Sequence, residues 1–89
     1  MKEVLTVRRI LDVLSAISSD RETAMYNGNS RLAIQKEYEF KRLIKPAFKL
    51  GYNALDINRA NLTGKINACM EAGDYNKENF YRMCLKEID

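Results

Sequence analysis

Basic residues at regular spacing are the side chains in this sequence most suited to binding chemistry. Lys41, Lys45 and Lys49 follow one another at four-residue intervals, and Arg42 lies beside the first of them. Residues four apart share one face of a helix, so this spacing predicts a positive stripe. Such a stripe can bind the phosphates of a nucleic acid or the carboxylates of an acidic protein surface.

A second interpretation of this stripe is a solvated helix face, because Glu37 and Glu39 lie among the lysines. Arg8 and Arg9 form another basic pair near the N-terminus. The net charge of +3 permits an acidic partner but does not require one.

Catalytic and metal-binding residue types are scarce. The sequence has no histidine, which removes the commonest general base, the Ser-His and Cys-His pairs and most zinc sites. Its four glycines are too scattered to form a phosphate-binding loop. Cys69 and Cys84 are expected about one helical turn out of register, so we expect small core residues rather than a disulfide or a metal site. These features predict no enzyme, no cofactor and no metal.

A weak helix-turn-helix pattern covers residues 47–62. Ala47 and Gly51 have the spacing of the alanine and the turn glycine in that motif. This alternative predicts a DNA-reading helix from residue 54, with Asn58, Arg59 and Asn61 directed at the major groove. Against it, Pro46 would leave the first helix of the motif very short.

Tyrosine is abundant for so small a chain. Five tyrosines are more than a thin core can hide with their hydroxyls hydrogen-bonded, so several are expected at the surface. Tyrosine with arginine is typical of binding hot spots. The alternative is that these side chains form the rim of the core.

Apolar spacing predicts the elements that position these residues. A helix is expected up to residue 26, continuous through Ser19, followed by a break at residues 27–30. Further helices are expected at about residues 31–50, 54–72 and 77–88, and Asn53 is expected to cap the helix at 54–72. Pro46 should kink the second helix or begin a new one. The fold class is therefore all-α, a single domain (residues 1–89) built as a small irregular bundle of four helices and ending in a helical hairpin. A fifth helix arises if Pro46 or Ser19 splits one.

The same periodicity predicts which side chains are buried. Leu55 and Met70 are expected in the core with the other apolar residues of the third helix, and Gly64 is expected to permit a close helix crossing. The last helix is expected to bury Phe80, either Met83 or Cys84, and Ile88. The wide apolar face of the first helix suggests a homodimer. Charged residues interrupt its apolar stretch, so no membrane span is expected and the chain should be cytoplasmic.

These observations favour a small non-enzymatic protein that occludes a surface of a host or cognate protein by stoichiometric binding. Its size and its asparagine, lysine and tyrosine content are similar in style to inhibitors and adaptors encoded by bacteriophages or mobile elements. The alternatives are a nucleic-acid-binding regulator and an oligomer that sequesters a small anionic ligand. The candidate partner contacts are Arg8, Arg9, Tyr38, Lys41, Arg42, Lys45, Lys49 and Tyr52.

Overall fold

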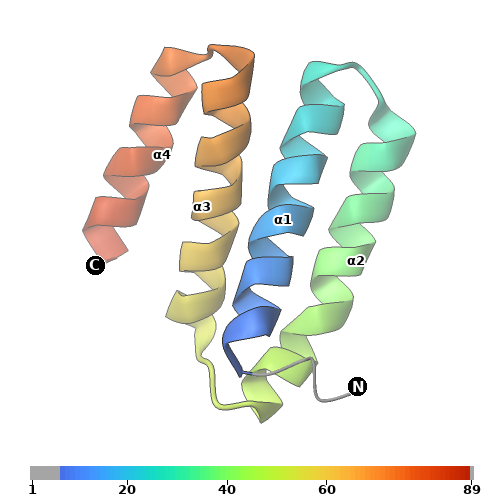
Figure 1. Cartoon of the computed structure of the whole chain (residues 1–89), viewed down its shortest axis with the longest axis vertical. Coiled ribbons are helices and arrows are strands. Elements are labelled where there is room, and N and C mark those ends of the chain that lie inside the picture. The colour runs from blue at the N-terminus through green and yellow to red at the C-terminus, as the bar shows by residue number, and fades with distance from the viewer. Residues whose placement is uncertain (1–6, 89) are drawn as a thin grey trace.

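The computed structural model describes residues 7–88, with side chains from residue 9 onward, and it is all-helical. The helices are α1 (Val7–Tyr26), α2 (Ser30–Lys49), α3 (Ala54–Ala72) and α4 (Tyr75–Ile88) (Figure 1). No strand occurs within residues 7–88. The predicted fold class and the arrangement of four helices are confirmed.

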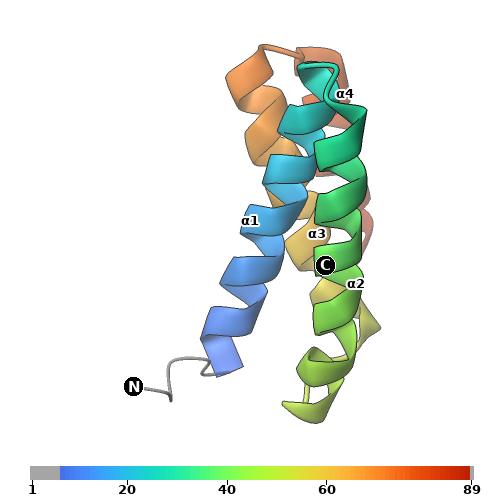
Figure 2. The same cartoon turned by 90° about the vertical axis from the view of Figure 1, so that its right-hand side faces the viewer.

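Helix α1 is central. It packs against both α2 and α3, whereas α4 packs mainly against α3. Figure 2 shows α1 on one side of the molecule, with α2 and α4 on the other. The molecule measures 36 × 31 × 19 Å, so its thinnest dimension is about half of its longest. A bundle this flat leaves much of each helix uncovered.

Two serines that interrupt the apolar pattern of α1 lie inside its contact with α3. The Ser15 hydroxyl donates to the Ala60 carbonyl oxygen at 2.8 Å, and the Ser18 hydroxyl donates to the Asn61 carbonyl oxygen at 2.9 Å. These bonds satisfy both hydroxyls away from water. Helix α1 therefore continues through this segment, as predicted, instead of ending there.

The predicted close crossing at Gly64 is confirmed. Gly64 is buried where α3 crosses α1. A Cβ atom there would overlap the Ser15 carbonyl oxygen and lie 2.8 Å from the Cβ of Ser18. Only a residue without a side chain allows the two backbones to approach this closely.

Capping residues fix the ends of the helices. Asn53 caps α3 as predicted, and it forms a reciprocal capping box with Asp56. Gly73 ends α3 with a φ of 74°, a conformation that favours glycine. Helix α4 begins at Tyr75, two residues earlier than predicted, because the Asp74 carboxylate accepts from the Lys77 amide at 3.2 Å.

Pro46 does not begin a new helix, because α2 runs through it without interruption. Proline cannot donate to the carbonyl of Arg42 one turn earlier. Both residues are exposed, so water can satisfy the carbonyl that is left without a backbone partner.

A buried apolar cluster, which is part of the core, lies where the N-terminal parts of α1 and α3 meet the end of α2. Its buried side chains are Ile10, Leu14, Ala47, Ile57 and Ala60, with Tyr52 among the partly buried residues packed against them. Because α2 and α3 both cover the apolar face of α1, this face is used within the chain. It therefore gives no support to the predicted homodimer.

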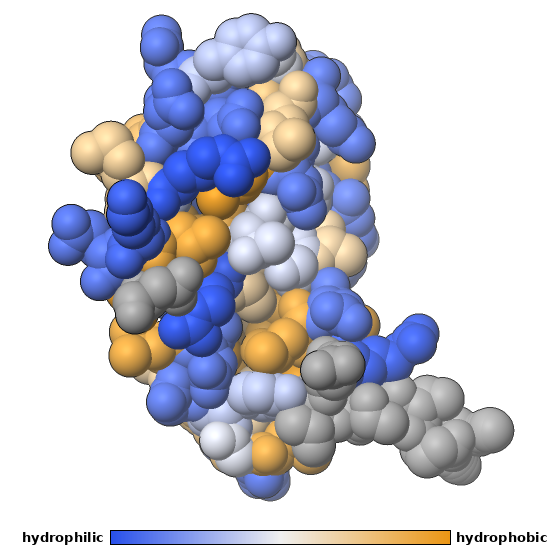
Figure 3. Space-filling view, turned by 60° about the vertical axis from the view of Figure 1, so that its left-hand side comes forward, coloured by the Kyte–Doolittle hydropathy of each residue, from blue (hydrophilic) through white to orange (hydrophobic). Residues whose placement is uncertain are grey.

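Some residues that were expected in the core are at the surface. Leu55 and Met70 of α3 are exposed, and α4 has no buried residue. Phe80 is 59% exposed and Met83 is 67% exposed. The expectation of burial was wrong here because α4 has a close neighbour on one side only. Figure 3 shows apolar side chains reaching the surface between polar ones on the side of the molecule where α3 and α4 lie.

Candidate interaction surface

The basic residues of the predicted stripe share one broad face of α2. Successive helical residues are about 100° apart, so the four side chains lie within a sector of about 100°, with Lys41 on the flank toward α3 and Arg42 with Lys49 on the other flank. Lys41 lines a hollow with Asn61 of α3, whereas Arg42 lines one with Glu39. Lys45 lies between the two flanks.

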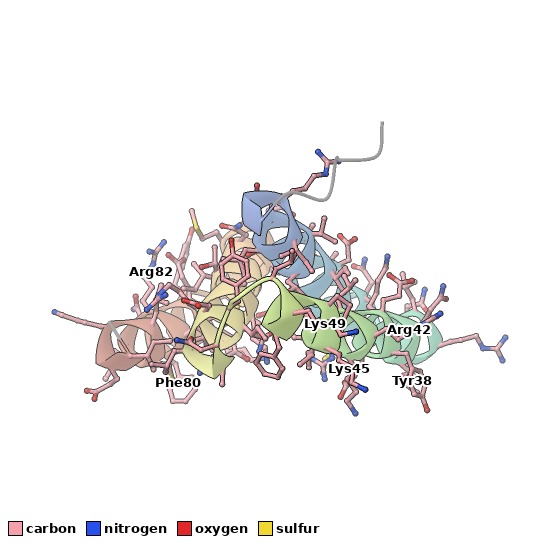
Figure 4. All side chains as sticks on the ribbon, turned by 90° about the horizontal axis from the view of Figure 1, so that it is seen from below. Tyr38, Arg42, Lys45, Lys49, Phe80 and Arg82 are labelled. Carbon is pink, nitrogen blue, oxygen red and sulfur yellow. The ribbon has the colours of Figure 1, made fainter. Side chains whose placement is uncertain are left out.

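The crest of α2 carries apolar side chains together with Lys45. Ile34 is 58% exposed and Tyr38 is 65% exposed, although both are large hydrophobic residues. Figure 4 shows Tyr38 and Lys45 projecting from α2 to the same side as Phe80 of α4. We call the set Ile34, Tyr38, Lys41, Arg42, Lys45 and Lys49 the α2 ridge.

Most positive charges of the α2 ridge have no acidic partner. Within the described residues, no carboxylate forms an ion pair with Arg42, Lys45 or Lys49. Lys41 lies 3.7 Å from Glu37, but Glu37 is also bound by Arg21 at 2.9 Å. The hydrogen bond from Arg21 lowers the pKa of Glu37, so this carboxylate stays ionised and is shared between two cations. The ridge is thus electropositive.

A groove runs between α2 and α3 on the side away from α1. It consists of two adjoining hollows of about 310 and 270 Å³, which share Phe40, Ile44 and Asn61. Ile17 and Ser18 of α1 lie at the bottom of the larger hollow. We call this feature the α2/α3 groove.

The two halves of the α2/α3 groove differ in charge. The smaller half is lined by apolar and amide side chains, including Phe48, Ile57 and Asn58, and by no charged residue. The larger half is lined by four cationic side chains and a single carboxylate, Glu37; the cations are Arg21, Lys36, Lys41 and Lys65. The ammonium group of Lys65 lies 5.3 Å from the centre of the Tyr81 ring of α4.

The remaining predicted contacts lie apart from the α2 ridge. Arg9 is exposed near the start of α1, and the side chain of Arg8 lies outside the described residues. Tyr52 packs against the core cluster and supports the fold. Lys65 and Phe48 were not predicted as site residues. Both line the groove, and this position depends on how far apart α1 holds α2 and α3.

The segment of the helix-turn-helix pattern folds differently from that motif. Figure 1 shows α2 and α3 antiparallel, whereas the motif's helices cross at about 90–120°. The Asn61 side-chain oxygen accepts from Ser18 at 2.6 Å, and Arg59 forms an ion pair with Asp56 at 3.4 Å. Asn58 is exposed at the α2/α3 groove.

An acidic hollow lies between α1 and α3. It has a volume of about 540 Å³ and is lined by Asp12, Asp20 and Glu71. Its remaining lining residues are uncharged. The molecule therefore has an acidic hollow between α1 and α3, and a basic surface on α2 and its groove.

A buried carboxylate joins α1 to α4. Glu22 is 2% exposed, lies 3.3 Å from the ammonium of Lys77 and accepts from the Tyr81 hydroxyl at 3.4 Å. The bond to Glu22 raises the pKa of Lys77, and burial together with the Glu22 charge raises the pKa of Tyr81. Glu22 lines none of the surface hollows described above, so we assign it a structural role.

Both cysteines are free. Cys69 is buried, with its sulfur 3.4 Å from the Tyr26 hydroxyl, and Cys84 is half-buried on α4. No group of three or more potential metal ligands occurs within residues 7–88. None of the helices in this range combines the length and apolarity needed to cross a membrane.

Comparison of the chain with protein families, with curated protein sequences and with solved structures finds no match. A functional assignment therefore has to be argued from the surfaces described above.

Proposed function

We propose that this chain is a small non-enzymatic binding protein that covers a surface of a partner protein with its α2 ridge. It acts by stoichiometric occlusion in the cytoplasm, in the manner of an inhibitor or adaptor of a phage or mobile element. The matching partner surface is acidic, with an apolar patch that receives Tyr38.

The observation that carries this proposal is the exposure of Ile34 and Tyr38 on a helix face most of whose cations form no ion pair within the described residues. Exposed apolar groups have no stabilising role in an isolated chain, whereas tyrosine beside basic residues suits the centre of an interface. Complementary charge would accelerate and orient association with an acidic partner.

Affinity capture from a lysate of the cells that naturally contain the protein tests the proposal. The expected result is one protein recovered in near-equal amount, in the presence of nuclease. Tyr38→Ala and Lys45→Glu should each reduce recovery at least tenfold, because an interface hot spot contributes about 2 kcal/mol or more.

Tyr75→Ala and Lys86→Glu provide matched controls. Both residues are exposed on α4, away from the α2 ridge, and neither forms a hydrogen bond or ion pair through its side chain within the described residues. These variants should recover the partner like the unmodified chain. Equal recovery with all four variants would exclude the α2 ridge as the contact surface.

The unpaired cations Arg42, Lys45 and Lys49 also support a second candidate function, nucleic-acid binding. Binding of this kind would weaken steeply as salt rises, because each phosphate contact releases counterions. Fluorescence anisotropy with a labelled duplex and a labelled single strand, at about 50 mM salt, tests it. No change in anisotropy up to micromolar protein concentrations would exclude this alternative.

A further inference from the structure

We propose that the α2/α3 groove is a docking site for one amphipathic helix of a partner protein, with acidic residues along its flank. This inference rests on the proposed protein-binding function and names the structural element that the protein recognises. It depends on the shape, the lining and the charge of the groove.

The shape of the groove suits a helix. Helix α1 covers the space between α2 and α3 on one side, and the opposite side is open along the two hollows. The α3 wall extends from Ala54 to Lys65, eleven residue steps, which corresponds to roughly 16 Å at the rise of an α-helix. This length accommodates about three turns of a docked helix, with anchors at i, i+4 and i+7.

The lining provides an apolar floor for those anchors. Phe40 and Ile44 extend through both halves of the groove, and Phe48 continues the apolar surface toward the end of α2. Phe48 is 49% exposed in the isolated chain. Covering these side chains with leucine or isoleucine side chains from a partner would remove apolar area from water.

The charge of the groove selects an acidic occupant. Lys65 forms no ion pair within the described residues, and Lys41 shares Glu37 with Arg21. Carboxylates on the flank of a docked helix could pair with Lys41 on one wall and with Lys65 on the other. A basic helix would meet like charges at both positions.

The same surface disfavours two other occupants. The α2 ridge of a second copy is itself positive, so bringing it to this groove would place like charges together. A nucleic acid would leave its phosphates without cations along the uncharged half, which contains Phe48, Ile57 and Asn58.

Selection from a displayed library of random peptides about sixteen residues long tests this inference with the full chain as bait. The enriched peptides are expected to be acidic and to repeat apolar residues at three- and four-residue spacing. Synthetic copies of these peptides should gain helical circular dichroism on binding. Enrichment of basic peptides or of peptides without this periodicity, or no enrichment at all, would contradict the proposal.

Variants of the chain then locate the binding site. Phe48→Ala and Lys65→Glu should weaken binding of the enriched peptides at least tenfold, whereas the controls Tyr75→Ala and Lys86→Glu should leave it unchanged. Circular dichroism melting of each variant shows that it is folded. Peptides that bind the folded Phe48 and Lys65 variants as tightly as the unmodified chain would place their site elsewhere and overturn the assignment.

Two further experiments distinguish helix docking in the α2/α3 groove from the proposed binding function on which it rests. They are sedimentation of the chain alone and capture of its natural partner by the variants. A concentration-dependent dimer that dissociates on Phe48→Ala would identify a second copy as the occupant and overturn the proposal. A natural partner that is lost on Tyr38→Ala but retained on Phe48→Ala and Lys65→Glu would confirm the α2 ridge and refute helix docking in the groove. Loss of the natural partner on all three substitutions supports both the α2 ridge as a contact surface and helix docking in the groove.

Discussion

At the scale of single residues, Gly64 sets the distance between α1 and α3. Gly64→Ala would push a methyl group against the Ser15 carbonyl oxygen, and backbone atoms of two packed helices have little freedom to move aside. We expect the unfolding free energy to fall by about 3 kcal/mol, measured by urea denaturation.

Gly28→Ala provides the comparison for that experiment. A Cβ at Gly28 meets no atom within 4 Å, so its only cost is the positive φ of 73°. That cost is about 1 kcal/mol. If the two alanine variants lose equal stability, close packing at Gly64 is not what holds the helices together.

A second residue-scale prediction concerns pH. The Tyr26 hydroxyl donates to the Asp74 carboxylate at 2.7 Å, and this bond, with the Lys77 amide, lowers the pKa of Asp74 below 3.8. A lowered pKa means that the stabilisation is complete above the pKa of the unfolded chain and is lost as pH falls through the folded value. Asp74→Asn keeps a cap for α4 but removes this charge.

Asp74→Asn should therefore be less stable than the unmodified chain at about pH 6, and should lose less further stability between about pH 5 and pH 2. Tyr26→Phe should also lose less stability over this pH range, because it removes the main cause of the lowered pKa of Asp74. Thermal melts across this pH range measure both effects. If the unmodified chain and both variants lose equal stability as pH falls, the assigned role of Asp74 is contradicted.

Residue-level features that depend on neighbours along the chain could be predicted from the sequence. The Asn53 cap and the break around Gly28 are examples, because a cap or a turn needs only local residue types. Exposure of Leu55 and Met70 could not be predicted, because it depends on where α4 packs.

At the scale of elements, α4 is the least secured helix. It has no buried residue and packs mainly on α3, and it contacts α1 through Glu22 and through Lys77, whose ammonium lies over the Tyr26 ring. Hydrogen exchange should therefore be faster for the amides of α4 than for those of α1 and α3. Equal protection of α4 and α1 would show that α4 unfolds only with the whole molecule.

Removal of the buried carboxylate should loosen α4 further. Glu22→Ala deprives Lys77 and Tyr81 of their shared partner. We expect a loss of about 2 kcal/mol, which is less than for a fully buried pair because Lys77 is partly exposed. Exchange should quicken most in α4. A uniform increase across all four helices would instead indicate that Glu22 stabilises the bundle as a whole.

The four helices follow from apolar periodicity and from the breaks at Asn27 and Gly73. The continuity of α2 through Pro46 does not follow from periodicity, because predicting it requires knowing that the turn around Pro46 faces water. Periodicity identifies the apolar side of a helix but not how many neighbours will cover it. This is why the apolar residues of α4 were expected to be buried.

At the scale of the whole molecule, flatness and charge separation define the candidate interface. The spacing of Lys41, Lys45 and Lys49 predicted a basic face, but the flanks to which they belong depend on the position of α3. Tyr38 could be proposed from residue type alone. The α2/α3 groove could not be predicted. Helices α2 and α3 are joined by residues 50–53, and the groove exists only because α1 holds them apart.

The most direct test of the central claim is an NMR titration of the isotope-labelled chain with its captured partner. We predict that the largest amide shift changes fall on residues 34–49 of α2, with smaller changes on the facing side of α3. Changes centred on the acidic hollow between α1 and α3, or spread evenly over all helices, would contradict it.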